Sequence, residues 1–200
     1  MKEIALEIPV CIIAAALIMV VHELTKSIVY LCVRKMQGQA ASHNNSIFAV
    51  WRYIDPLGLL LSATCFVPFS KPHLFRIRDK KTNMILGVAG FITLLALFVL
   101  SIAVLKTGCL GMGALFSAGG MAARITSIFW QYMAILSFDM FIANMFPVST
   151  FDMGLVIAGF SARHYLQIIK ADSAIKLIFI LALMFDIIHY GCIRLLRLLL

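Results

Sequence analysis

Charged residues are scarce in this 200-residue chain, and acidic ones are the scarcest. Only 13% of the residues are charged, with nine acidic side chains against 17 basic ones, and 62% are hydrophobic. Soluble domains carry about a quarter charged residues. The composition therefore excludes an ordinary soluble domain and predicts one membrane-embedded domain over residues 1–200.

The sequence also lacks the patterns of two common kinds of site, cysteine frameworks and phosphate-binding loops. The five cysteines are odd in number and contain no CxxC pair, so they predict neither a disulfide framework nor a cysteine metal site. The glycine-rich stretch at residues 108–120 lacks the Lys and Ser/Thr of a phosphate loop. Small apolar packing is the expected role of the cysteines, and a turn that of the glycines.

The most prominent features of the sequence are its long apolar runs. About 20 helical residues cross roughly 30 Å of hydrocarbon, and four runs reach or approach that length: residues 8–33, 84–105, 125–146 and 177–193. We therefore expect an all-α polytopic membrane protein with about four transmembrane helices. A signal peptide is the alternative for the first run, but its apolar core continues past any cleavage site, which favours a retained helix.

The stretch between the first two runs needs a different structure. Its apolar part, Leu57 to Phe69, is only 13 residues long and follows Asp55-Pro56-Leu57-Gly58. A segment of that length is re-entrant or interfacial rather than spanning, and its proline and glycine punctuation favours extended pieces over a helix. We expect a re-entrant or short β segment there.

The basic residues are distributed unevenly along the chain. Eight lie between the first and second runs and two between the second and third. By the positive-inside rule the first connection faces the cytoplasm, so the expected location is the cell membrane with an external N-terminus. The formal charge of +8 thus reflects topology and anionic lipid, and we expect no nucleic-acid partner.

Ionisable residues inside two of the runs mark the candidate site. The first run contains His22, Glu23 and Lys26, and the third is followed by Pro147 and Asp152. Such residues are expensive in a membrane and indicate function. Pro147 should open the helix near Asp152. A carboxylate at membrane depth needs a cation, which is either a metal held by His22 or the ammonium of Lys26.

Other histidines are weaker candidates. Asp186 and His189 share a face of the last run and are reserve site residues, although a structural hydrogen bond between them is an equal alternative. His43, His73 and His164 lie in polar stretches and are expected to be solvated.

The motifs of this chain, in their order along the sequence, resemble those of the site-2 protease family of intramembrane zinc metalloproteases. Four of its motifs have counterparts: HExxH in His22 and Glu23, DPxG in Asp55, Pro56 and Gly58, the basic run and Ala-Gly helix in Lys71, Pro72, Arg76, Arg78, Ala89 and Gly90, and NxxPxPxxDG in Asn144, Pro147 and Asp152. The resemblance implies zinc ligands His22 and Asp152, Glu23 as general base, and substrate binding near Asn144 and Pro147. The implied partner is a transmembrane protein.

The departures from the family fall on its chemistry. Lys26 stands where the second histidine ligand should be, Phe91 and Ser149 replace prolines, and Met153 delays the glycine that follows Asp152. A catalytic zinc needs three protein ligands and an open position. Only two ligands match, and Lys26 would have to lose its proton to supply a third.

Two functions compete on these residues. One is an active zinc endopeptidase in which Glu23 acts as general base on a zinc-bound water. The other, which we favour, is an impaired or inactive protease-like scaffold that binds a transmembrane segment or partner, with zinc absent or weakly bound. A transporter or channel would rest on intramembrane charges alone, without an inverted repeat.

Overall fold

Helices account for every regular element that the structure describes. The computed structural model describes residues 2–38, 49–71, 79–108, 112–186, 189–191 and 193–194. Its elements, in chain order, are α1 (Lys2–Met36), the 3-10 helix η2 (Val50–Tyr53), α2 (Pro56–Cys65), α3 (Lys80–Thr107), α4 (Met112–Ala118), α5 (Gly120–Asn144), α6 (Asp152–Phe160) and α7 (Ala162–Met184). The expected all-α class is confirmed for these residues.

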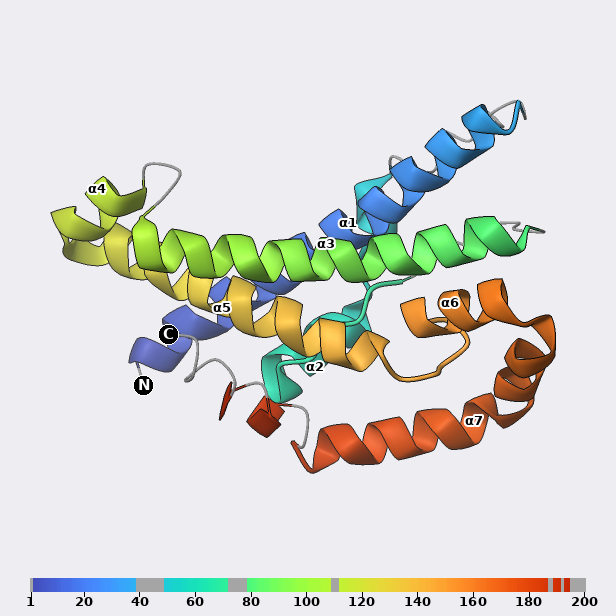
Figure 1. Ribbon diagram of the computed structural model, residues 1–200. Coiled ribbons are helices and arrows are strands. Elements are labelled where there is room, and N and C mark those ends of the chain that lie inside the picture. Colours follow the sequence, from blue (N-terminus) through green and yellow to red (C-terminus); the bar gives the residue numbers. More distant parts are fainter. Residues whose placement is uncertain are drawn as a thin grey trace.

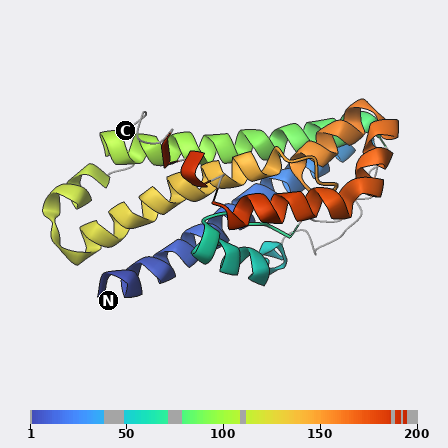
Figure 2. The same ribbon diagram turned by 90° about the horizontal axis from the view of Figure 1, so that it is seen from below.

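Three helices are long and apolar enough to cross a membrane. They are α1 over Leu6–Met36, α3 and α5. Figures 1 and 2 show the three lying side by side in one bundle, with α6 and the start of α7 at the end where α1 finishes and α3 begins. A multi-pass membrane protein is therefore the architecture that the described helices support.

The last apolar run does not form a fourth helix of this kind. Its first half belongs to α7, which ends at Met184, and Asp186 adopts a left-handed φ of 51°. Left-handed backbone is unfavourable for a non-glycine residue and interrupts a helix. The described residues thus contain three candidate spans where the sequence suggests about four.

Helix α2 corrects the expectation of extended structure after Asp55. The Asp55 carboxylate accepts a hydrogen bond from the Leu57 N–H at 3.1 Å, and Pro56 occupies the first helical position. Both features favour a helix start, so the extended prediction is wrong from Leu57 to Cys65. The helix ends at Phe66, whose φ is 57°, and beyond it Ser70 forms an isolated antiparallel bridge with Ile54.

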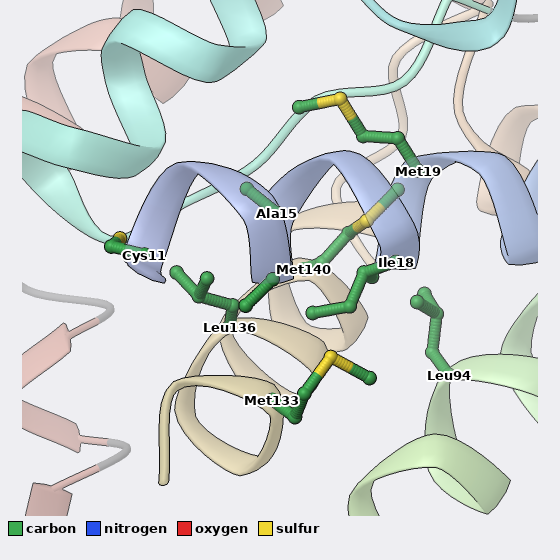
Figure 3. Close-up of a cluster of buried hydrophobic side chains, with 9 residues drawn as sticks. Cys11, Ala15, Ile18, Met19, Leu94, Met133, Leu136 and Met140 are labelled. Carbon is green, nitrogen blue, oxygen red and sulfur yellow. The ribbon is translucent and has the colours of Figure 1, made fainter. Parts of the chain in front are cut away.

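The core is an apolar cluster in which α1 meets α3 and α5 (Figure 3). Helix α1 contributes Cys11, Ala14, Ala15, Ile18 and Met19, which recur every three or four residues, the spacing of one helix face. Helix α3 contributes Leu94, and α5 contributes Met133, Leu136 and Met140. Small residues on α1 let neighbouring helices approach closely in a membrane. The same face of α1 continues directly into the His22 cluster.

Some residues singled out from the sequence lie outside the described part of the chain. They are His43, His73, Pro72, Arg76 and Arg78.

Candidate functional site

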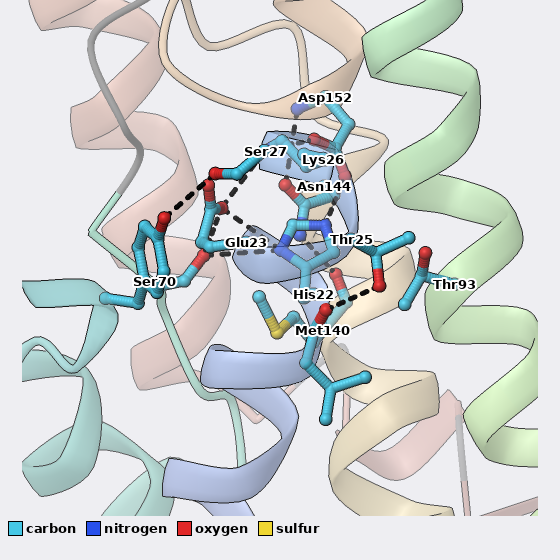
Figure 4. A network of polar contacts seen from close by, with 12 residues as sticks. His22, Glu23, Thr25, Lys26, Ser27, Ser70, Thr93, Met140, Asn144 and Asp152 are labelled. Carbon is cyan, nitrogen blue, oxygen red and sulfur yellow. Dashed lines mark hydrogen bonds and ion pairs between the residues drawn. The ribbon is translucent and has the colours of Figure 1, made fainter. Parts of the chain in front are cut away.

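Four ionisable side chains from two helices meet in the interior of the bundle. His22, Glu23 and Lys26 lie on α1, one helical turn beyond the apolar core, and Asp152 is the first residue of α6. All four are at least 98% buried. Their contacts bring Asp152 to both His22 and Lys26, the two side chains from which the sequence predicts its cation partner (Figure 4).

Lys26 is the cation that both carboxylates share. Its Nζ lies 2.9 Å from Asp152 Oδ1 and 3.0 Å from Glu23 Oε1. His22 also lies between the same two acids, with Nε2 2.7 Å from Asp152 Oδ2 and Nδ1 3.1 Å from Glu23 Oε1. Each acid therefore contacts both basic side chains, as a buried charge cluster requires for its desolvation to be offset.

The position of Asp152 depends on close packing of α6 against α3. A Cβ atom on Gly90 would overlap the Asp152 carboxylate, and one on Gly87 would lie 2.6 Å from the Asp152 carbonyl oxygen. Asn144 Oδ1 accepts a hydrogen bond from the Asp152 N–H at 3.3 Å. Two glycines and one amide thus hold the carboxylate at the start of α6, where the helix dipole favours a negative charge.

One polar contributor to the site, Ser70, is not among the residues that the sequence pattern predicts. Its hydroxyl donates to Glu23 Oε1 at 2.8 Å and lies 3.4 Å from His22 Nδ1. Ser70 reaches the site because the segment after α2 returns along η2 through the Ile54–Ser70 bridge. A single serine after the apolar stretch that ends at Phe69 carries no sequence signal of its own, since only the chain path brings it to α1.

A small cavity adjoins the charge cluster. It measures about 20 Å³ and is lined by Glu23, Lys26, Phe69, Ser70, Met140, Asn144, Thr150 and Phe151. Among the described residues, none forms a hydrogen bond with Glu23 Oε2. A cavity of this volume accommodates about one water molecule, so the interior has room for a solvent partner of Glu23 but not for a peptide.

The zinc implied by the family resemblance does not fit this donor set. A protonated lysine offers three donors and no lone pair, and Lys26 occupies the place of the third ligand beside His22 and Asp152. Within the described ranges, no group of three His, Cys, Asp or Glu side chains could hold a metal ion. A catalytic zinc site takes three protein ligands, and these residues supply two.

Asn144 and Pro147, the substrate-binding candidates, differ in their surroundings. The Asn144 amide is buried and already engaged, because Nδ2 donates to the Met140 carbonyl at 3.0 Å while Oδ1 accepts from Asp152. Pro147 is exposed in the turn between α5 and α6. Asn144 can therefore position Asp152, whereas Pro147 lies on a surface that another molecule can reach.

The reserve candidates are not part of this cluster. His189 Nδ1 lies 3.0 Å from Asp139 Oδ2, and the Phe66 ring stacks on the imidazole with centroids 4.3 Å apart. Asp186 is exposed. The hydrogen bond suggested between Asp186 and His189 is thus replaced by one between His189 and Asp139, a buried carboxylate of α5.

A further aromatic group covers the site from the side of α7. The Phe179 ring packs against Phe69 and Phe151, each with a centroid distance of 5.4 Å, and against Phe146 at 4.9 Å. Phe69 and Phe151 also line the small cavity. α7 therefore separates that cavity from the outside of the bundle on this face.

The charge cluster combines residues of α1, of the segment after α2 and of α6, which are far apart in the sequence. A scan against protein-family models, a search of curated proteins and a search of solved structures each find no match to this chain.

Proposed function

We propose that this protein is a membrane-embedded scaffold with the motif order of a site-2 protease, in which Lys26 provides the positive charge that zinc would otherwise supply. The observation that carries the proposal is the Lys26 ammonium, which contacts Asp152 at 2.9 Å and Glu23 at 3.0 Å. Glu23, the residue that would act as general base, accepts a hydrogen bond from this lysine. The scaffold binds a transmembrane segment or partner and does not cleave it.

The energetic reason is the cost of burying two carboxylates. Each buried charge loses several kcal/mol of hydration, and this loss is offset only by a partner with good geometry. Lys26 is 98% buried and reaches both acids. The cluster can therefore stabilise the meeting of α1 and α6 without any metal ion.

The binding surface that we propose is the turn between α5 and α6. Pro147 and Thr150 are exposed there, and Thr150 also lines the cavity beside Glu23. A transmembrane segment of the partner lies against this turn in the proposal. α2, with 10 residues, is too short to cross a membrane, and we propose it as a re-entrant segment at the same level.

Zinc analysis of the purified protein tests the proposal. The wild type should contain well under one zinc per chain, and Lys26→His should raise the zinc content because His22 and Asp152 then complete three donors. Lys26→Met should destabilise the protein by about 3 to 5 kcal/mol, since it leaves buried carboxylates without their cation. Lys35→Met is the control, because Lys35 is an exposed lysine of the same helix.

The competing function gives a different result. Stoichiometric zinc in the wild type, lost in Lys26→Met but not in Lys35→Met, would mean that the lysine is a working ligand. Cleavage of a transmembrane model peptide by the wild type, abolished by Glu23→Gln, would establish an active intramembrane endopeptidase. Either result would overturn the scaffold proposal.

A further inference from the structure

A second and larger cavity lies away from the charge cluster, between α6 and the first half of α7. This groove has a volume of about 510 Å³, and its lining includes Ile157, Phe160, Ser161, His164, Ile168 and Ile175. Phe160 is 69% exposed. Large exposed apolar surfaces of this kind mark binding sites, and the site described above does not use this one.

The groove is polar at one end and apolar along its length. Ser161, His164 and Gln167 lie at or near the turn that joins α6 to α7, while Ile168 and Ile175 follow along α7. The lining residues His164, Ile168, Ala171 and Ile175 are spaced three to four residues apart, so they share one face of α7. A molecule that fits such a groove has a polar head and an apolar tail.

The polar end lies where α3 enters the bundle. A Cβ atom on Gly159 would lie 2.6 Å from Met84 Cβ and 2.9 Å from the Lys80 carbonyl oxygen. The end of α6 thus packs directly on the first turn of α3. Figures 1 and 2 both show α6, the start of α7 and the start of α3 at this end of the molecule.

Positive charge predominates at this end. Lys80 and Lys81 are exposed on the first turn of α3, and Arg163 is exposed beside His164 at the start of α7. The nearest acid on α3 is its capping residue Asp79, whose carboxylate accepts hydrogen bonds from Thr82 and Gln37. The starts of α3 and α7 thus carry three exposed cations, whereas the Asp79 carboxylate is already hydrogen-bonded.

The acid of α7 is neutralised locally as well. Asp172 pairs with Lys176 at 2.5 Å and accepts the Ser149 N–H at 3.1 Å. Partial burial opposes its ionisation, but these hydrogen bonds outweigh burial and hold the pKa of Asp172 below its ordinary value. Asp172 thus carries its own cation and leaves Arg163 and Lys170 uncompensated by that residue.

From this combination we propose that the groove between α6 and α7 binds one anionic phospholipid. The phosphate lies near Arg163 and Lys80, where basic side chains attract anionic lipid, and an acyl chain lies along Ile157, Ile168 and Ile175. The proposal is independent of the scaffold function, because it uses none of the residues around Lys26.

Lipid retention measured by native mass spectrometry tests the site. Purified protein is equilibrated in detergent with equal amounts of phosphatidylglycerol and phosphatidylcholine of identical chains. The wild type should retain phosphatidylglycerol preferentially. Arg163→Gln should lower that preference about fivefold, because each basic residue near a charged membrane surface changes lipid affinity by about that factor.

Two matched substitutions test the groove itself. Ala171→Trp fills the groove and should abolish retention of phosphatidylglycerol, whereas Ser173→Trp places the same ring on the opposite face of α7 and should leave it unchanged. Lys35→Gln removes one exposed charge from the end of α1 and should leave the lipid preference intact. Glycerol phosphate, which carries the anion without acyl chains, should not displace the lipid.

Three results would contradict the proposed lipid site. Equal retention of both lipids by the wild type would overturn the proposal, as would an Ala171→Trp variant that retains phosphatidylglycerol like the wild type. Displacement by glycerol phosphate would show a simple anion site and would overturn the assignment of the apolar part of the groove.

Discussion

Residues 22–26 differ from the HExxH pattern at a single position, Lys26. With histidine at position 26, the side chains of residues 22 and 26 would share one face of α1 in the HExxH pattern. Lysine at that position brings an ammonium instead, and the structure shows it between Glu23 and Asp152. A lysine at this position therefore supplies a counter-ion to the two acids, where a histidine would offer a ring nitrogen.

Gly90 is the residue on α3 that this geometry requires most directly. A Cβ atom there would overlap the Asp152 carboxylate, so Gly90→Ala must push Asp152 away from Lys26. We expect Gly90→Ala to destabilise the protein by about 1 to 3 kcal/mol, the usual cost of overpacking. Thermal or denaturant unfolding in one detergent measures the change.

A second glycine provides the control for Gly90. At Gly113 an added Cβ would meet its nearest neighbour at 3.5 Å, an ordinary contact. Gly113→Ala should be neutral or slightly stabilising, because alanine is favoured over glycine within a helix. If Gly90→Ala unfolds at the same point as the wild type, the close approach of α6 to α3 is wrong.

The ionisable residues of the site can be predicted from the sequence, but the residue that hydrogen-bonds to them from the segment after α2 cannot. His22, Glu23, Lys26 and Asp152 are conspicuous because charges are costly in apolar runs. Ser70 is an ordinary loop residue by sequence, and its contact with Glu23 depends on the fold of the chain after α2. The energetic cost of a charge within an apolar run can be recognised in a sequence, whereas a contact between distant segments cannot.

At the scale of elements, the helix boundaries follow from short-range chemistry. α5 ends at Asn144 and α6 begins at Asp152, as Pro147 predicts, because proline and its preceding residue disfavour a continuing helix. The prediction of extended structure at the start of α2 is wrong because Asp55-Pro56 is typical both of a turn and of a helix start. In the structure Asp55 caps α2 by accepting the Leu57 N–H, and Pro56 occupies the first helical position.

A pair between His189 and the buried Asp139 connects the C-terminal segment to α5. Asp139 is fully buried, and His189 Nδ1 lies 3.0 Å from its Oδ2. Hydrogen bonds to a charged group contribute about 1.5 to 3 kcal/mol. A double-mutant cycle of Asp139→Asn and His189→Phe should therefore show a coupling free energy in that range.

The choice of phenylalanine preserves a second contact at that position. The His189 ring stacks on Phe66, and a phenyl ring can keep this stacking while it loses the hydrogen bond. Asp186→Asn serves as the control, because Asp186 is an exposed carboxylate of the same segment, and it should change the stability little. Additive effects of the two substitutions, within about 0.5 kcal/mol, would contradict the pairing.

At the scale of the whole molecule, the two ends of the bundle differ in charge. α1 finishes with Arg34 and Lys35, α3 begins with Lys80 and Lys81, and Figures 1 and 2 show the end of α1 and the start of α3 at the same end of the bundle. Only Lys106 and Arg124 lie in or near the connection at the other end, which contains α4. This asymmetry was evident from the sequence, because it depends on the order of charges and not on packing.

The charge asymmetry predicts the orientation in the membrane. The connection between α1 and α3 should face the cytoplasm, and the N-terminus and α4 should face outward, because basic connections are retained inside. The measurement is labelling of single cysteines by an impermeant thiol reagent added to intact cells, in a background without the five native cysteines. Ser42→Cys, which lies outside the described residues, should be labelled only after permeabilisation. Ser117→Cys, at an exposed position of α4, should be labelled from outside, and labelling of Ser42→Cys in intact cells would reverse the orientation.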